Sequence, residues 1–257
     1  MNSISSLKEK LKNKKLTIGS WITIPSIEIV EIMSTAGFEW LVVDLEHTSI
    51  TIDQAKHLIH AIQANSMKAL VRVSKNEEVI IKRVLDCGAD GIIVPMVRTI
   101  EDAKKAVSFA QYPPLGKRGV GLSRAQNYGT SFDEYKKWIE NEMIVIAQIE
   151  HIDAVNNIND IINVNGIDGT IIGPYDLSAS MGYPGEYNRE EVKEALQKVE
   201  NQILKSSVSL GFHVIESDHS FSLDKIKKDY SFIAFSIDFF FIGDMARNQM
   251  EQLKSKI

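Results

Sequence analysis

Short runs of β-branched and other apolar residues alternate along this chain with longer stretches that carry a helical pattern. Each apolar run is followed by a helical stretch, for example 26–36 after the first run and 51–64 after the second. Near-continuous apolar strands separated by helices are typical of a parallel sheet that helices cover. The eight runs predicted as strands are 16–22, 40–47, 68–73, 90–96, 144–150, 168–173, 211–216 and 232–242.

Eight strand–helix units in 257 residues predict an α/β protein of the (β/α)₈ barrel type, since such barrels usually need about 250 residues. We find no linker or shift in composition, so we expect a single domain over residues 1–257. Two connections, 111–143 and 176–190, are longer than the others. Long connections inside a compact domain are usually functional, so we expect both near the site.

Charge and composition exclude several classes of protein. The net charge is −5, and the only basic run, KEKLKNKK at 8–15, is predicted to be a solvated helix face, so nucleic acid is not an expected partner. The single cysteine, Cys87, excludes an internal disulfide and multi-cysteine metal motifs. The first ten residues lack the apolar core of a signal peptide, and no apolar run approaches the roughly 18 residues of a membrane span. We therefore expect a cytoplasmic enzyme or binding protein.

Acidic and amide side chains follow two of the predicted strands. Gln148 and Glu150 stand at positions i and i+2 and point to one face, and Asp176 follows the next strand. Carboxyl ends of barrel strands meet at one rim, where barrel enzymes place their chemistry. Two carboxylates there suit a hard cation such as Mg²⁺ or Mn²⁺. Taken singly, Asp176 could instead cap the following helix, and Glu150 could pair with Arg72.

The same rim receives residues from earlier strands. Arg72 lies in an apolar strand and needs a carboxylate or an anionic ligand, so it either forms a structural ion pair or stabilises a developing negative charge. His47 follows the second strand and could act as a base near neutral pH, although many such histidines are ordinary loop residues. The other residues expected at this rim are Trp21, Asp44 and Glu46.

Some chemistries are disfavoured by what the rim lacks. No predicted strand carries a lysine in its C-terminal half, and Lys68 stands at the start of its strand, so a Schiff-base mechanism is not expected. Neither GxGxxG nor GxxxxGK[ST] occurs. The last two units show no glycine-rich phosphate cradle, so nothing supports a phosphosugar substrate.

Seven motifs, in order, resemble those of the HpcH/HpaI family of metal-dependent class II pyruvate aldolases. The likeness extends from about Gly19 to Asp238, and it is the ordered set that is specific. The motifs are GSW at 19–21, AGFEWLVVDLEH at 36–47, LVRV at 70–73, VLDCGADGIIVPMV at 84–97, PPLGKRGVG at 113–121, QIE at 148–150 and GPYDLSASMG at 173–182.

The resemblance implies reversible cleavage of a 4-hydroxy-2-oxo acid to pyruvate and an aldehyde, with Mg²⁺, Mn²⁺ or Co²⁺. It implies a barrel whose last helix is exchanged between subunits of a homo-oligomer, commonly a hexamer or trimer of dimers. Matching positions assign roles residue by residue. Glu150 and Asp176 match the metal ligands, and Gln148 and the Tyr175 backbone match the positions that hold pyruvate. Arg72 matches the arginine that stabilises the enolate, and His47 matches the base.

Asp86 matches the acid that raises the basicity of this histidine. It ends a helix before the fourth strand, at the opposite end of its own barrel, so its pairing with His47 would cross a subunit contact.

Two departures from the family pattern limit the choice of substrate. Tyr175 stands where many members have a small residue, and the loop 118–129, expected to face the aldehyde, differs from the arginine-rich loop of dicarboxylate-cleaving members. A 2-keto-3-deoxy sugar acid or a simple 4-hydroxy-2-oxo acid is therefore as good a candidate as a long diacid. The alternatives are a related enolate-forming C–C or C–P lyase, an oxaloacetate decarboxylase and a non-catalytic metabolite-binding barrel.

Overall fold

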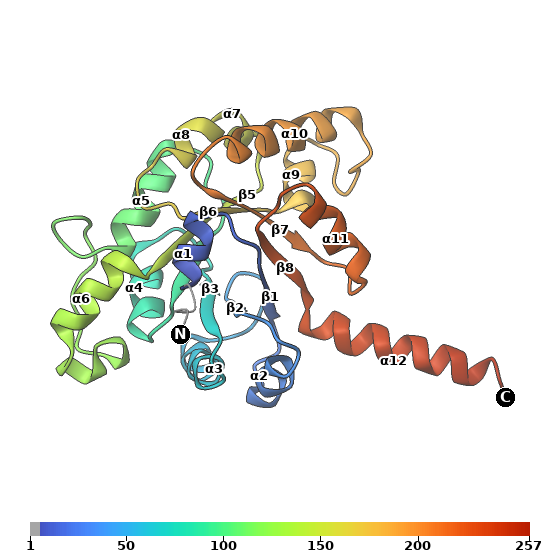
Figure 1. Cartoon of the computed structure of the whole chain (residues 1–257), viewed down its shortest axis with the longest axis horizontal. Coiled ribbons are helices and arrows are strands. Elements are labelled where there is room, and N and C mark those ends of the chain that lie inside the picture. The colour runs from blue at the N-terminus through green and yellow to red at the C-terminus, as the bar shows by residue number, and fades with distance from the viewer. Residues whose placement is uncertain (1–5) are drawn as a thin grey trace.

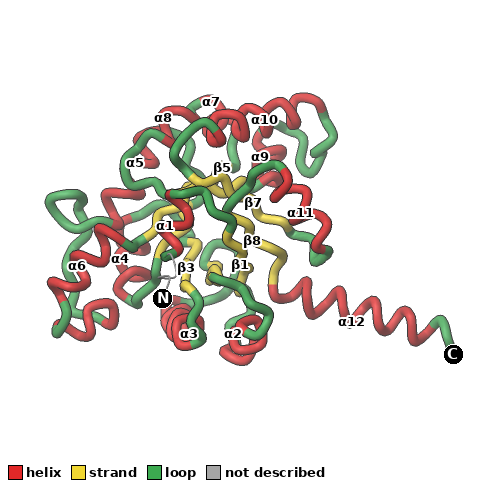
Figure 2. Tube along the Cα trace, in the orientation of Figure 1, coloured by secondary structure: helices red, strands yellow, loops and turns green. Residues whose placement is uncertain are grey.

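A computed structural model describes residues 6–257 as a closed barrel of eight parallel strands in sequence order, each paired with its neighbours (Figures 1 and 2). The (β/α)₈ architecture predicted from the sequence is confirmed. The strands are β1 Thr17–Ile22, β2 Trp40–Asp44, β3 Lys68–Arg72, β4 Gly91–Val94, β5 Ile144–Ile149, β6 Gly169–Ile172, β7 Ser209–Val214 and β8 Phe232–Ile237.

Helices surround the barrel, and several begin where the sequence supplies a capping side chain. Ser26 accepts a hydrogen bond from the amide of Ile29, while Thr51 and Thr99 form capping boxes with Gln54 and Asp102. The helices are α1 Leu7–Lys12, α2 Ile27–Ser34, α3 Ile52–Ala64, α4 Glu78–Asp86, α5 Ile100–Ala110, the 3₁₀ segment η1 Arg124–Gly129, α6 Phe132–Asn141, α7 Ile152–Asn156, α8 Ile158–Ile162, α9 Pro174–Ser180, α10 Glu190–Leu204, α11 His219–Lys227 and α12 Asp238–Lys254.

Two apolar clusters stabilise the fold. The larger one lies between the strands and the surrounding helices, and the smaller one fills the barrel itself. Inside the barrel the rings of Trp40 and Phe232 stack with centroids 4.2 Å apart. Leu7 and Leu11 of α1 belong to this inner cluster, so α1 closes the N-terminal end of the barrel. The basic run at 8–15 is therefore not simply a solvated helix face: Lys8 donates to the Met143 carbonyl and pairs with Asp168.

The last predicted strand was too long. The run 232–242 is apolar except for Ser236 and Asp238, yet β8 ends at Ile237 and the residues after it begin α12. The side chain of Asp238 is buried and accepts hydrogen bonds from the backbone amides of Thr23 and Ile24, both at 2.8 Å. These bonds fix the point at which the chain leaves the sheet.

The long segment 111–143 does not lie where the sequence predicted. It follows α5 and precedes β5, so it joins a helix to a strand at the N-terminal end of the barrel. Arg118 in this segment donates to Asp86 at the end of α4, at 2.6 Å. The expectation that this loop faces the site of its own barrel is wrong, because connections on the catalytic side run from strand to helix.

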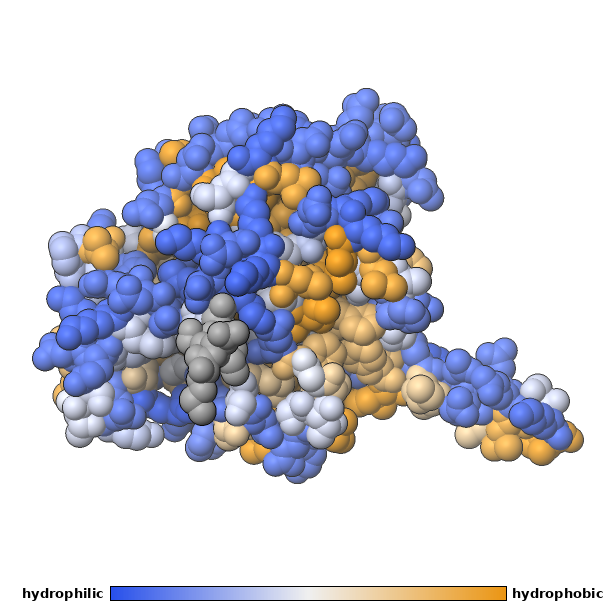
Figure 3. All heavy atoms as spheres, viewed as in Figure 1, coloured by the Kyte–Doolittle hydropathy of each residue, from blue (hydrophilic) through white to orange (hydrophobic). Residues whose placement is uncertain are grey.

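The C-terminal helix α12 projects away from the barrel instead of lying against it (Figure 1). Figure 3 shows apolar atoms both on the barrel near the start of α12 and on one side of the helix. An apolar groove of about 520 Å³ lies there, lined by Ile18, Ile32, Met33, Phe38, Phe235 and Phe241 among others. Among residues 6–257, no helix has the length and apolar character that crossing a membrane requires.

Candidate active site

Arg72 is held at the C-terminal rim by the strand beside it. The register pairs Arg72 of β3 with Asp44 of β2, and the two side chains form a bidentate ion pair, Nε to Oδ1 at 2.9 Å and Nη2 to Oδ2 at 2.8 Å. Burial acts to raise the pKa of Asp44, but the hydrogen bonds and charge of Arg72 outweigh it and hold that pKa below its usual value. The protein partner of Arg72 is therefore Asp44 and not Glu150, and the guanidinium has a fixed orientation.

Glu46 lies between the predicted base and the predicted enolate stabiliser. Its Oε2 is 3.4 Å from Nε of Arg72 and 3.7 Å from Nε2 of His47, and it accepts no hydrogen bond from a described residue. Burial raises the pKa of Glu46 to about 7; the positive charge of Arg72 opposes this shift, whereas the charges of Asp44 and Asp176 add to it. A half-buried carboxylate that accepts no hydrogen bond favours a further cation beside Arg72.

Glu150 follows β5 and is almost completely buried. Its Oε1 accepts a 2.6 Å hydrogen bond from the backbone amide of Met96, whose φ of +55° is unusual for a side-chain-bearing residue. Its Oε2 accepts from Nε2 of Gln148. Burial, with the negative charges of Glu46 and Asp176, raises the pKa of Glu150 to about 7, although the hydrogen bonds from Met96 and Gln148 oppose this shift.

Asp176 enters the site from the first turn of α9. Gly173 occupies the cap position and Pro174 begins the helix, so Asp176 lies inside it and the alternative of a capping aspartate is wrong. A Cβ on Gly173 would lie 3.2 Å from Oε2 of Glu150, which shows how closely this turn approaches that carboxylate. The side chain of Tyr175 is exposed, so the backbone is the part of this residue that the site can use.

A small cavity of about 70 Å³ opens among these groups. Trp21 of β1 forms one wall: its ring lies 4.5 Å from the guanidinium carbon of Arg72 and 4.9 Å, between centroids, from the imidazole of His213 on β7. The cavity therefore combines one charged side with one largely apolar side. Its lining is Trp21, Arg72, Gln148, Ile171, Ile172, Gly173, Pro174, Tyr175, Asp176, His213 and Ile215.

His47 and Asp86 are not brought together within one chain. His47 lies at the rim with 63% of its side chain exposed. Asp86 lies at the other end of the barrel, where it pairs with the buried Arg118, which also bonds the hydroxyl of Tyr135. The assignment of Asp86 to His47 thus stays a prediction about two different subunits.

The donor set at the rim fits a hard divalent cation. Glu46, Glu150 and Asp176 form one anionic region, and two buried atoms there, Oε2 of Glu46 and Oε1 of Gln148, have no hydrogen-bond partner among the described residues. Within residues 6–257, no group of three or more His, Cys, Asp or Glu side chains is arranged to hold a metal ion by itself. Two carboxylates, Glu150 and Asp176, suit an ion such as Mg²⁺, which usually takes one or two and keeps waters and substrate oxygens.

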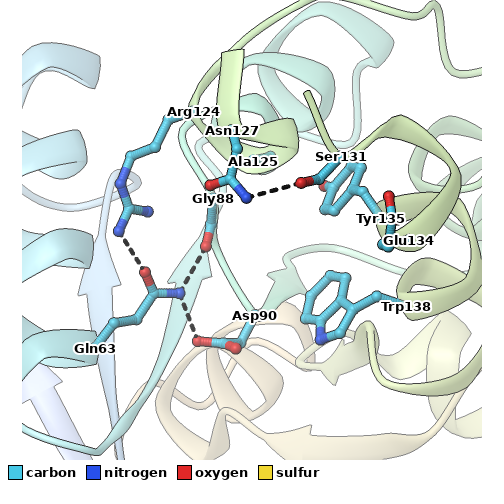
Figure 4. A pocket seen from close by; sticks show the side chains of 10 residues that line it. All are labelled: Gln63, Gly88, Asp90, Arg124, Ala125, Asn127, Ser131, Glu134, Tyr135 and Trp138. Carbon is cyan, nitrogen blue, oxygen red and sulfur yellow. Dashed lines mark hydrogen bonds between the residues drawn. The ribbon is translucent and has the colours of Figure 1, made fainter. Parts of the chain in front are cut away.

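Another cavity, of about 480 Å³, lies at the N-terminal side of β4 (Figure 4). Its polar side chains are bonded to one another: Gln63 accepts from Arg124 at 2.9 Å and donates to Asp90 at 2.9 Å. Gly88 and Asp90 precede the strand. This cavity is therefore remote from the rim that carries the carboxylates.

Three contributors were missed or given no role at the sequence level. Glu46 was placed at the rim without a function, although its carboxylate lies beside both Arg72 and His47. Met96 contributes only a backbone amide, which no side-chain pattern identifies. His213 was treated as part of an ordinary strand, but its alternation with Phe212 and Val214, which face the outer core, indicates that it points into the barrel.

Comparison with known proteins matches residues 17–234 to the family model described as HpcH/HpaI aldolase/citrate lyase. A 2-keto-3-deoxy-L-rhamnonate aldolase of Escherichia coli (strain K12) is 32% identical over 259 aligned residues, which cover 99% of this chain and 96% of the relative. A family protein from Burkholderia cenocepacia J2315 has a TM-score of 0.91 at 28% identity, covering 96% of this chain and 98% of its own. An HpcH/HpaI aldolase from Desulfitobacterium hafniense DCB-2 has a TM-score of 0.89 at 30% identity, covering 98% and 97%.

Two further solved structures have different names. The citrate synthase SbnG has a TM-score of 0.86 at 26% identity, covering 98% of both chains. A citrate lyase beta subunit from M. tuberculosis, solved with oxaloacetate and magnesium, has a TM-score of 0.59 at 11% identity, covering 90% of this chain and 95% of its own, a likeness of fold alone.

Proposed function

This chain belongs to the HpcH/HpaI aldolase/citrate lyase family, and from that premise we propose how its rim residues act. It is a carbon–carbon lyase of the aldolase type, which cleaves a 4-hydroxy-2-oxo acid to pyruvate and an aldehyde. The observation that supports our assignment of roles is the anionic region of Glu46, Glu150 and Asp176 beside the fixed guanidinium of Arg72. A 2-oxo acid is negatively charged and suits a position beside Arg72, and a divalent cation would balance the charge of the carboxylates.

Members of this family are metal-dependent, and we propose that Glu150 and Asp176 hold the ion in this chain, with Mg²⁺, Mn²⁺ or Co²⁺ as candidates. When bound, the ion would supply Lewis-acid polarisation of a substrate oxygen. Gln148 orients Glu150 through its amide, and the Met96 amide holds the other carboxylate oxygen. These two bonds leave the carboxylate little freedom to rotate, so the site is organised before the ligand arrives.

Arg72 stabilises the negative charge that develops on the keto oxygen as the C3–C4 bond breaks. Its Nε and Nη2 are committed to Asp44, and no described residue accepts a hydrogen bond from Nη1, so that group serves the substrate. His47 takes the proton of the 4-hydroxyl group, a role that suits an exposed imidazole at the rim. Oε2 of Glu46 lies 3.7 Å from Nε2 of His47, so the two side chains adjoin at the rim.

The family assignment leaves open which 2-oxo acid is the physiological substrate. The 32% identical relative is named for 2-keto-3-deoxy-L-rhamnonate, and we propose a sugar-derived 2-keto-3-deoxy acid as the substrate class here. The likeness to a citrate synthase supports a second candidate, a related enolate reaction in which oxaloacetate is a reactant. Product analysis with oxaloacetate and a panel of aldehydes separates these two.

We further propose that α12 docks on a second copy of the chain. Helix α12 exposes five apolar side chains, and the groove beside α2 is also apolar. The five are Phe239, Ile242, Met245, Met250 and Leu253. A helix that projects with such a stripe requires a partner surface. An exchange of this kind gives the homo-oligomer expected for the family and is compatible with Asp86 of one subunit reaching His47 of the next. It would also bring the loop bonded to Asp86 toward that neighbouring site.

Proton exchange at the methyl group of pyruvate tests the proposal. In D₂O with Mg²⁺ or Mn²⁺, the protein should exchange the methyl protons without any aldehyde, and thorough chelation should stop the exchange. Glu150→Ala should behave like the chelated protein, whereas the matched control Glu142→Ala, outside the site, should not. Exchange that survives chelation, or full exchange in Glu150→Ala, would remove the metal assignment.

A further inference from the structure

A larger cavity, of about 590 Å³, adjoins the small cavity at the rim. It lies beside the end of β7, between α10 and α11, and the side chains of Leu196 and Phe212 form part of an apolar wall. Pro174, His213 and Ile215 line both cavities. The two cavities therefore share a wall, and a small molecule that leaves the rim meets the larger cavity.

The amine of Lys225, on α11, is held in this cavity by aromatic rings. Its Nζ lies 3.8 Å from the ring centroid of Phe212 and 5.2 Å from that of Tyr230. Among residues 6–257, no carboxylate lies within ion-pair distance of this Nζ, whereas Lys228 on the same helix is paired with Asp224 at 3.0 Å. The rings thus position the amine, and no ion pair shields it from a molecule that enters the cavity.

The environment of Lys225 favours the reactive form of its amine. Burial lowers the pKa of Lys225, and the positive charge of Lys228 acts in the same direction. The negative charges of Glu200, Asp224 and Glu216 oppose this shift without cancelling it. At a given pH, a larger fraction of this amine is therefore unprotonated than of an ordinary lysine amine. An unprotonated amine in an apolar pocket is a nucleophile for carbonyl carbon atoms.

The charges of the cavity favour an uncharged carbonyl compound. Glu216 lines the cavity, and the ammonium group of Lys228 is committed to Asp224. A 2-oxo acid that reacted with Lys225 would place its own carboxylate in the same cavity as Glu216, with no further cation to compensate it. An aldehyde adds no charge, and the proposed lyase releases an aldehyde in the neighbouring cavity.

We propose that Lys225 binds a small uncharged aldehyde covalently, as a reversible imine; the choice of an aldehyde rests on the proposed function. The lone pair of Nζ forms a bond to the carbonyl carbon. The carbonyl oxygen then leaves as water with the two hydrogens of the amine, and the imine nitrogen takes a proton from solvent. No oxidant or reductant is consumed, and addition of water reverses the reaction.

The protonated imine suits the place that the ammonium group occupies. It keeps one positive charge over the faces of Phe212 and Tyr230, so the contact that positions the amine also stabilises the adduct. The aldehyde carbon chain then lies against the apolar wall of the cavity. Lys225 stands on a helix outside the rim cavity and takes no part in breaking the C3–C4 bond. It is a modification site for the aldehyde product.

Reductive trapping tests the proposal. The full chain is incubated at neutral pH with propanal and sodium cyanoborohydride, which reduces an imine to a stable propyl-amine. After digestion with a protease that does not cut at lysine, mass spectrometry gives the initial rates of alkylation at Lys225 and at Lys227, an exposed lysine on the same helix. The ratio of the two rates should be about 10 or more, because the cavity holds the aldehyde beside an activated amine.

Two variants examine the cavity and the ring contact. Ser220→Trp places a large side chain at the lining of the cavity and should lower the ratio. Leu223→Trp introduces the same residue at an exposed position of α11 outside the lining, and it is the matched control that should keep the wild-type ratio. Phe212→Leu keeps an apolar side chain but removes one aromatic face, so it should also lower the ratio.

The outcomes separate this inference from the function on which it rests. Equal rates at Lys225 and Lys227 in the wild type, or an unchanged ratio in both Ser220→Trp and Phe212→Leu, would overturn the imine site. Faster trapping of pyruvate than of propanal at Lys225 would overturn the choice of an aldehyde. Exchange of the pyruvate methyl protons is measured on the same preparation. If that exchange is absent while Lys225 is alkylated preferentially, the imine site stands and the proposed function fails.

Discussion

At the level of single residues, the charges of the site are fixed before substrate binds. The pair of Arg72 and Asp44 is the clearest example, because both side chains are buried and their strands are in register. The sequence showed that Arg72 needed an anion, but the partner came from strand pairing, which a single sequence does not reveal. Asp44 and Glu46 are both rim residues two apart, and only the structure shows that Asp44 is the bidentate partner of Arg72 while Glu46 makes a single, longer contact with it.

Arg72→Ala should lower the rate of pyruvate proton exchange by about 10²–10³-fold, the usual effect of removing one preorganised charge. Arg72→Lys should recover little, because an ammonium group cannot make the bidentate contact with Asp44. Exchange rates under saturating metal provide the measurement. An Arg72→Ala protein within tenfold of wild type would give this residue a structural role only.

His213 also makes stability depend on pH. Its pKa is about 3 in the folded protein and near the ordinary 6.5 when unfolded, so the unfolded chain binds more protons between these values. The full free energy of unfolding is therefore present above pH 6.5, and part of it is lost as the pH falls from 6.5 toward 3. Between pH 7.5 and 5.5 this should cost the wild type about 1–2 kcal/mol that His213→Leu does not lose. Urea unfolding at both pH values, at one protein concentration, measures it; equal losses in the two proteins would contradict it.

Gln148, Glu150 and Asp176 could be predicted from the sequence because each stands at a position that the barrel places at its rim. His213 could not, because a histidine inside a strand looks the same whether its ring meets a cavity or a packed core. The missing information is which interior positions remain unfilled, and that depends on side chains from other strands.

At the scale of elements, the end of β8 shows why an apolar run can mislead. The residues after Ile237 have strand-like composition, yet they form the first turn of α12. A tertiary contact decides the boundary, because Asp238 bonds the loop after β1.

Asp238→Ala should destabilise the protein by roughly 3 kcal/mol, since it leaves the part-buried amides of Thr23 and Ile24 without an acceptor. Asp238→Asn should cost less because it keeps one acceptor oxygen. Chemical unfolding of both variants gives the comparison. A loss below about 1 kcal/mol in the alanine variant would show that other contacts hold this junction.

The segment 111–143 shows a second limit at this scale. Its length and glycines correctly indicated a special connection, but helix-to-strand and strand-to-helix connections lie at opposite ends of a barrel. The order of the predicted elements already contained that distinction, since the segment follows a helix and precedes a strand.

At the scale of the whole molecule, the eight-unit pattern predicted the closed barrel completely, because each strand is buried on both faces and reads as apolar. The position of α12 relative to the barrel could not be predicted from the periodicity of the sequence. The helix has an apolar stripe, as a barrel helix does, yet it does not cover its own barrel.

Removing residues 245–257 should reduce the oligomeric state, because it deletes Met245, Met250 and Leu253 from the docking stripe. Light scattering after size-exclusion chromatography measures the mass of each protein. Asn248→Asp, an exposed change on α12 that leaves those apolar side chains in place, is the control and should keep the wild-type mass. A monomeric wild type, or a truncated protein with an unchanged number of subunits, would contradict the docking proposal.

In the proposed mechanism, a divalent ion held by Glu150 and Asp176 lies beside the bound 2-oxo acid. Paramagnetic broadening of the pyruvate methyl resonance by Mn²⁺ tests it most directly, because the effect requires ion and ligand to be close. We predict strong broadening with substoichiometric wild-type protein loaded with Mn²⁺, and broadening near that of free Mn²⁺ with Glu150→Ala or Asp176→Asn. Equal broadening in wild type and both variants would contradict the account.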